Sequence, residues 1–132
     1  MKSLDRIVAG AIAGIGLLHI GVTPIAFSEL NRPALWFASG GLAMLFGAAL
    51  NLLRSVYGQT APGLRWVSLA ANLCMLAFAA VMASLDRARL FSPQALILFS
   101  LLLAATLFSM ARPAGAVGRH APIAGRNARE RA

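Results

Sequence analysis

Residues 7–27 read IVAGAIAGIGLLHIGVTPIAF, a stretch without a single charged residue. About 20 apolar residues in a helix cross the ~30 Å hydrocarbon core of a bilayer, so this stretch is long enough to span it. Three further uncharged stretches follow at residues 33–53, 66–85 and 90–111. Because lipid offers no partner to backbone N–H and C=O groups, each stretch should be helical. The sequence predicts an all-α membrane protein, an up-down bundle of four transmembrane helices.

Composition agrees with this class, since 59% of the 132 residues are hydrophobic and only 12% are charged. We expect one transmembrane domain at residues 1–111, followed by a tail at residues 112–132. The first apolar stretch is longer than that of a cleaved signal peptide, so we interpret it as a retained anchor. Asn31 is placed to cap the second helix, with Pro33 in its first turn. Eleven of the twelve basic residues are arginine, which favours a bacterial source.

The basic residues indicate an orientation rather than a nucleic-acid site. Nine of them fall on the side that would hold both termini and the middle connection, and three fall on the other side. Cytoplasmic loops carry an excess of Lys and Arg, so both termini should be cytoplasmic and the protein should lie in the bacterial inner membrane.

The tail contains several glycines and prolines, and its composition predicts a disordered basic segment. Arginines beside a membrane also bind anionic lipid headgroups. We therefore expect headgroup contacts from four tail residues: Arg119, Arg126, Arg129 and Arg131.

Small residues recur along the first two helices. At about 100° per residue, Gly10, Gly14 and Gly21 share one stripe of the first helix, and Gly40 and Gly47 share a face of the second. Such spacing lets two helix backbones approach closely. The first helix should therefore be central in the bundle or lie at a homo-oligomer interface. The fourth helix has no clear polar stripe and is expected to be the most exposed to lipid.

His19 lies on the opposite side of the first helix, with Thr23 one turn further along. An ionisable residue inside a span is by default a candidate functional residue. One interpretation is axial ligation of haem or a metal, and another is a hydrogen bond to a quinone or lipid. The alternative is a neutral histidine bonded to Thr23, to Ser100 at a similar depth, or to a backbone carbonyl freed by Pro24.

Asn51 and Asn72 pose the same choice. Each can form an interhelical hydrogen bond that sets the packing, or line a polar site open to the cytoplasm. The hypothesis of an intramembrane ligand site therefore includes five residues: His19, Thr23, Asn51, Asn72 and Ser100.

Catalysis by this chain is not expected. The four apolar stretches contain no Asp or Glu, which a proton-coupled exchanger would need, and Cys74 is the only cysteine. The second histidine, His120, lies in the tail, so a haem held by two histidines would need a dimer or a methionine partner.

LLHIGVTPIAF together with ALWFASGGLAMLFGAALNLL is similar to a group of small, uncharacterised four-helix bacterial membrane proteins, and more loosely to DoxX-like membrane proteins. The resemblance involves six residues of the first two helices: His19, Thr23, Pro24, Trp36, Gly41 and Asn51. It implies no substrate and no assigned site residue.

Two functions follow as hypotheses. The first is a non-enzymatic membrane protein that acts through helix–helix association, as an accessory subunit or a homo-oligomer. The second is a binder or carrier of a hydrophobic small molecule, such as a lipid, quinone or haem, at a polar site around His19.

Overall fold

The computed structural model describes residues 2–85 and 91–111. Within them the chain forms four helices, which are α1 (Lys2–Ala26), α2 (Arg32–Tyr57), α3 (Pro62–Leu85) and α5 (Pro93–Met110). All four are long and apolar enough to cross a membrane, which is the architecture of a multi-pass membrane protein. The prediction of four apolar helices is confirmed. The predicted tail, with the cytoplasmic placement of its end, lies outside the described residues.

Three of the helices are longer than the apolar stretches that predicted them. α1 begins at Lys2 rather than Ile7, α2 continues to Tyr57 rather than Leu53, and α3 begins at Pro62 rather than Trp66. A helix need not end where the hydrocarbon ends, because polar side chains at its last turns reach water or one another. This correction brings Asp5 and Arg54 onto helices, although we expected no acidic residue within a span.

Two helix starts are capped by the residue types that favour such positions. The Asn31 Oδ1 atom accepts a hydrogen bond from the backbone N–H of Ala34 at 3.0 Å, which confirms the predicted cap of α2. In the same way, Ser92 Oγ accepts from the backbone N–H of Ala95 at 3.3 Å and caps α5. In each helix a proline follows the cap, where its missing N–H costs nothing.

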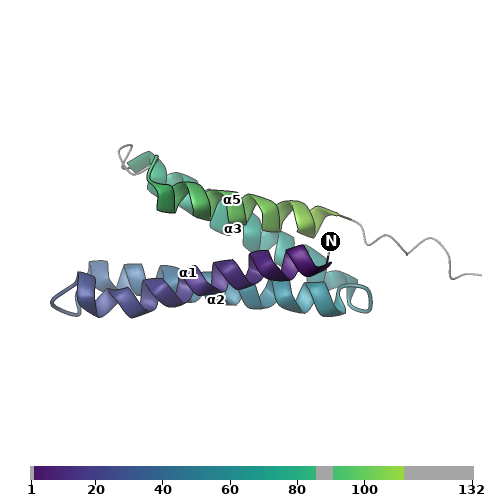
Figure 1. The fold of residues 1–132 in the computed structure, drawn as a ribbon, viewed down its shortest axis with the longest axis horizontal. Helices are drawn as coiled ribbons and strands as arrows, with labels where there is room; N and C mark the ends of the chain where they lie inside the picture. Colours follow the sequence, from purple (N-terminus) through teal and green to yellow (C-terminus); the bar gives the residue numbers. More distant parts are fainter. Residues whose placement is uncertain (1, 86–90, 112–132) are drawn as a thin grey trace, which may run out of the picture.

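The helices pair as two hairpins, α1 with α2 and α3 with α5 (Figure 1). The hairpins lie closest together where α1 begins and α5 ends, and they diverge toward the opposite ends of the helices (Figure 1). We call the first of these the terminal end and the second the far end. The hydrophobic core lies in the terminal half and is formed by six buried residues: Val8, Ile12, Met44, Ala48, Leu102 and Ala105.

The first hairpin is closed by two glycines that face each other. A Cβ atom built on Gly16 would lie 2.7 Å from the carbonyl oxygen of Gly41, and one built on Gly41 would lie 2.6 Å from the carbonyl oxygen of Gly16. No side chain larger than hydrogen fits such a distance. The two backbones are therefore in direct contact, as in small-residue packing of membrane helices.

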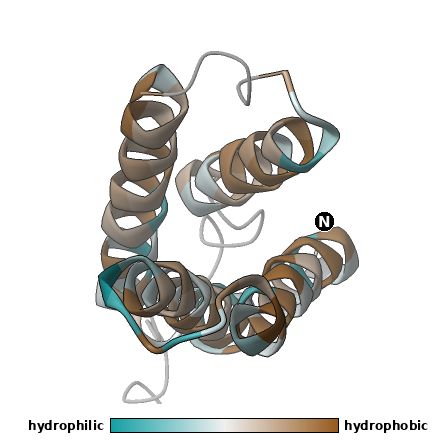
Figure 2. Ribbon diagram, turned by 90° about the vertical axis from the view of Figure 1, so that its left-hand side faces the viewer, coloured by the Kyte–Doolittle hydropathy of each residue, from teal (hydrophilic) through white to brown (hydrophobic). Residues whose placement is uncertain are grey.

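The outer surface of the bundle carries many large apolar side chains, and most of the ribbon is apolar in the colouring by hydropathy (Figure 2). Large side chains such as Leu17, Trp36 and Phe91 are more than 60% exposed. An apolar surface of this extent suits lipid rather than water. We expected α5 to be the most lipid-exposed helix, but it buries Leu102 and Ser109 against its neighbours, and a smaller share of α3 than of α5 is buried.

Candidate functional site

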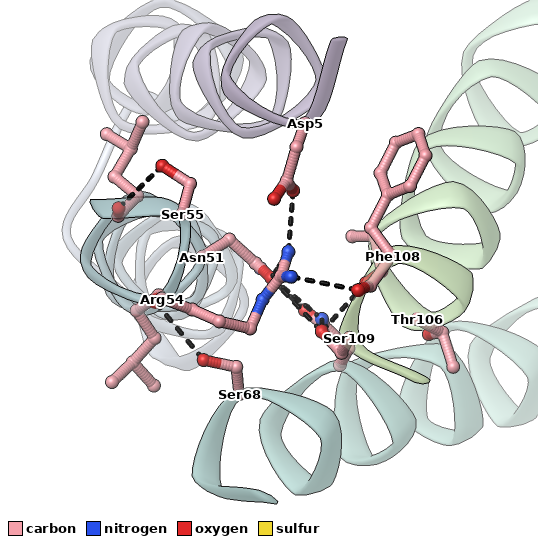
Figure 3. Close-up of polar contacts among 12 residues, drawn as sticks. Asp5, Asn51, Arg54, Ser55, Ser68, Thr106, Phe108 and Ser109 are labelled. Carbon is pink, nitrogen blue, oxygen red and sulfur yellow. Dashed lines mark hydrogen bonds and ion pairs between the residues drawn. The ribbon is translucent and has the colours of Figure 1, made fainter. Parts of the chain in front are cut away.

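A cluster of polar side chains joins all four helices at the terminal end (Figure 3). Its charged centre is an ion pair between Asp5 in the first turn of α1 and Arg54 in the last turn of α2. The Asp5 Oδ1 and Arg54 Nη2 atoms are 2.5 Å apart, and the two side chains are only 10% and 9% exposed. Each of these charges is withdrawn from water and is neutralised by the other. Either charge left alone at this place would be strongly destabilising.

Arg54 also binds the last turn of α5. Its Nη1 atom donates to the carbonyl oxygen of Phe108 at 2.9 Å, while Nη2 makes a longer contact of 3.4 Å with Asn51 Oδ1. The last carbonyls of a helix have no partner within it and carry partial negative charge. The guanidinium therefore stabilises the end of α5 while it neutralises Asp5, and three helices meet at one side chain (Figure 3).

A second arginine, Arg65 in the first turn of α3, binds the same helix end. Its Nε atom donates to the carbonyl oxygen of Ser109 at 2.8 Å, and Nη2 donates to that of Met110. Its guanidinium lies 5.6 Å from the ring centre of the neighbouring Trp66. Three successive carbonyls of α5 thus receive donors from arginines of two other helices.

Beneath the ion pair, two asparagines form a reciprocal amide pair. Asn51 Nδ2 donates to Asn72 Oδ1 at 2.8 Å, and Asn72 Nδ2 donates to Asn51 Oδ1 at 3.0 Å. Each asparagine also donates its second amide hydrogen. Asn51 Nδ2 donates to the Gly47 carbonyl at 2.9 Å, and Asn72 Nδ2 donates to Ser109 Oγ at 3.1 Å. Both asparagines are 1% exposed.

The amide pair therefore behaves as the interhelical hydrogen bond that the sequence left as one alternative. All four amide N–H groups have partners within the chain, so neither asparagine keeps a donor for a ligand. Ser68 extends the same contact between α2 and α3, because its Oγ atom donates to the Leu50 carbonyl at 3.1 Å. The geometry joins α2, α3 and α5 at a fixed register.

The other three residues of the predicted ligand site lie elsewhere. Ser100 is exposed on α5, and its Oγ donates to the Leu96 carbonyl of its own helix at 2.8 Å. Thr23 is buried, and its Oγ1 donates to the His19 carbonyl at 2.7 Å. The structure thus brings His19 and Thr23 together in one group and Asn51 and Asn72 in another, and it does not assemble all five residues into one site.

His19 is half-buried between α1 and α2, next to the Gly16–Gly41 contact. Its Nδ1 atom lies 3.2 Å from the carbonyl oxygen of Ile15. Its ring stacks on that of Phe37, with ring centres 4.5 Å apart and planes at 17°, and Phe27 lies 5.8 Å from Phe37. Within the described residues, no group of three or more His, Cys, Asp or Glu side chains could hold a metal ion.

The glycines predicted to pack helices face away from neighbouring atoms. A Cβ atom on any of them would have no atom within 4 Å beyond its immediate surroundings in the helix. These glycines are Gly10, Gly14, Gly21, Gly40 and Gly47. Inside the chain the close packing is made instead by Gly16 and Gly41, whose role the spacing of small residues did not indicate. A contact of these five glycines with another chain stays a prediction.

The four tail arginines predicted to contact lipid headgroups lie outside the described residues. Comparison of the chain with family models, with curated proteins and with solved structures finds no match. The resemblance to small four-helix and DoxX-like membrane proteins therefore stays a prediction.

Proposed function

We propose that this chain is a non-enzymatic integral membrane protein that acts by helix–helix association, as a homo-oligomer or as an accessory subunit of a membrane complex. The contact surface is the outer stripe of α1, formed by Gly10, Gly14 and Gly21. Its partner is a transmembrane helix of a second copy or of another protein.

One observation carries the proposal. The buried residues of α1, among them Asp5, Val8 and Ile12, lie on one side of the helix, and the three glycines lie on the other. All three are exposed, and a Cβ atom on any of them would meet nothing within 4 Å. This side of α1 therefore exposes backbone at three positions, and a second helix can approach it closely there.

The way the chain uses Gly16 supports this interpretation. Glycine within a helix is less stable than alanine by about 0.5–1 kcal/mol, and a close backbone contact that only glycine allows can offset this cost. Gly16 has one in the carbonyl of Gly41. Gly10, Gly14 and Gly21 have no such contact within the chain. A partner helix would supply it.

We propose further that the terminal end faces the cytoplasm of a bacterial cell. Arg54 and Arg65 lie at this end, and an excess of arginine is typical of the cytoplasmic side. The tail that follows α5 would then start at the inner leaflet, where its arginines could bind anionic headgroups.

The test replaces Gly14 with leucine and measures the oligomer mass by native mass spectrometry, with crosslinking in native membranes as a second measurement. Gly14→Leu should reduce the oligomer or the co-purified subunit at least tenfold, because the added side chain separates the two backbones. Folding should not suffer, since the site is open within the chain and leucine is the better helix former.

Ala49→Leu is the matched control, because Ala49 is exposed on α2 and the substitution adds similar apolar bulk. The control should leave association unchanged. A wild-type protein that is monomeric without any bound subunit in both measurements would overturn the proposal. Equal association of wild type and Gly14→Leu would show that α1 is not the contact surface.

A further inference from the structure

The hydrogen bond of His19 determines where its ring proton lies. The Ile15 carbonyl oxygen, 3.2 Å from Nδ1, can only accept, so Nδ1 carries the hydrogen in this arrangement. In the neutral imidazole the other nitrogen, Nε2, is then a bare acceptor. A backbone carbonyl that accepts from Nδ1 fixes the tautomer of a histidine and leaves Nε2 as the acceptor.

Nε2 is also accessible. It has no hydrogen-bond partner among the residues that the structure describes, yet it is not fully buried. In that part of the chain, Arg54 Nε is the one fully buried side-chain nitrogen or oxygen atom without a partner. Nε2 of His19 therefore keeps some exposed surface on a half-buried side chain, at which a molecule outside the chain can contact it.

The depth of His19 restricts what that molecule can be. At about 1.5 Å per residue, His19 lies about 7 Å from the middle of the span Ser3–Ala26, toward the far end. Water is scarce at this depth, and an acceptor without a partner is costly there. Acyl chains carry no donor, so the partner of Nε2 must bring an O–H or N–H group into the hydrocarbon region.

The aromatic neighbours indicate the shape of this partner. Phe37 is stacked on the imidazole, and Phe27 packs at an angle against Phe37. All three side chains are half-buried, so each keeps some exposed surface, and the rings follow one another from His19 to Phe37 to Phe27. Rings pack on such surfaces in offset or edge-to-face geometry.

We propose that Nε2 of His19 and the rings of Phe37 and Phe27 form a binding site for an aromatic amphiphile with a free hydroxyl group, such as an alkylphenol or a hydroquinone. The hydroxyl donates to Nε2, and the aromatic ring lies against the phenylalanines. The site distinguishes this class from its ethers and from oxidised quinones, which have no hydrogen to donate. This site needs neither the outer glycines nor association.

The experiment compares two probes that differ only in the donor, 4-octylphenol and its methyl ether. The full chain, carrying His120→Gln so that His19 gives the only histidine signal, is placed in lipid nanodiscs with nitrogen-15-labelled histidine. The free protein should show an Nε2 resonance typical of an unprotonated, unbonded nitrogen. The phenol should shift this resonance and should bind about threefold to tenfold more tightly than the ether.

His19→Phe keeps an aromatic ring on Phe37 but removes the acceptor, so it should abolish the preference for the phenol. Phe37→Leu should weaken binding of both probes and retain the preference. Equal affinity of the two probes for wild type would overturn the proposal. So would an Nε2 atom that is protonated or already bonded in the free protein, or a bound haem seen in the absorption spectrum.

Discussion

Nη2 of Arg54 lies 2.5 Å from Oδ1 of Asp5, and this contact joins the last turn of α2 to the first turn of α1. The same guanidinium donates to the Phe108 carbonyl of α5. One side chain thus connects both hairpins at the end where they lie closest (Figure 1). The divergence of the hairpins toward the far end makes this connection more important, because little buried packing lies there.

Loss of the carboxylate should be costly. Asp5→Asn leaves the buried charge of Arg54 without a counter-ion, and the free energy of unfolding should fall by about 3 kcal/mol. Denaturant titration of the protein in detergent measures this free energy of unfolding. Glu29→Gln is the control, since Glu29 is exposed in the α1–α2 connection, and its effect should stay within about 0.5 kcal/mol. Equal stability of the Asp5→Asn variant and the control would show that the ion pair contributes nothing.

The amide pair should show direct coupling. Asn72→Ala leaves two polar groups of Asn51 without their partner, so the free energy of unfolding should fall by about 1 kcal/mol. A double-mutant cycle with Asn51→Ala should give a coupling energy of similar size, because each single change already removes the pair. Strict additivity of the two changes would contradict the reciprocal bond.

Two adjacent glycines should respond in opposite directions. Gly41→Ala places a Cβ atom 2.6 Å from the backbone oxygen of Gly16, which forces α1 and α2 apart and should cost about 1–3 kcal/mol. Gly40→Ala enters open space and should stabilise α2 by about 0.5–1 kcal/mol. Unfolding titrations of both variants check this difference. Similar effects of both substitutions would argue against direct backbone contact between the two helices.

Arg65 should control the last turn of α5. Arg65→Gln removes charged donors from the Ser109 and Met110 carbonyls, and opening of this turn should become easier by about 1 kcal/mol. Hydrogen exchange should then be faster at the Ala111 amide, which bonds to the Leu107 carbonyl, and unchanged in the middle of α2. Arg6→Gln, at an exposed position of α1, should leave exchange at Ala111 as in wild type.

The sequence predicted the helices well and the cluster at the terminal end poorly. Uncharged stretches of the right length report a membrane helix directly, and Asn31 followed by Pro33 marks a helix start. Asp5 and Arg54 were missed because apolar length alone defined the spans, which left Asp5 before the first span and Arg54 in the connection after the second. A helical period continued through residues 2–6 and 54–57 would have placed both on helices.

The glycines illustrate a second limit. Spacing along α1 identified the stripe of Gly10, Gly14 and Gly21, but spacing cannot tell which side of a helix meets its neighbour. Gly16 and Gly41 make the contact because the rotation of α1 against α2 brings them face to face. Similarly, His19 and Asn72 are both polar residues within predicted spans. His19 is half-buried and stacks on Phe37, whereas Asn72 is buried and both of its N–H donors are hydrogen-bonded.

The sequence by itself determined the number, position and apolar character of the helices, because transfer of a residue into lipid depends on its own side chain and backbone. Only the tertiary structure decided which polar residues meet: Asp5 with Arg54, Asn51 with Asn72, and His19 with Phe37. Most of these pairs join residues far apart in the chain, and their contacts depend on the rotation and crossing of whole helices. Local spacing carries no information about that rotation.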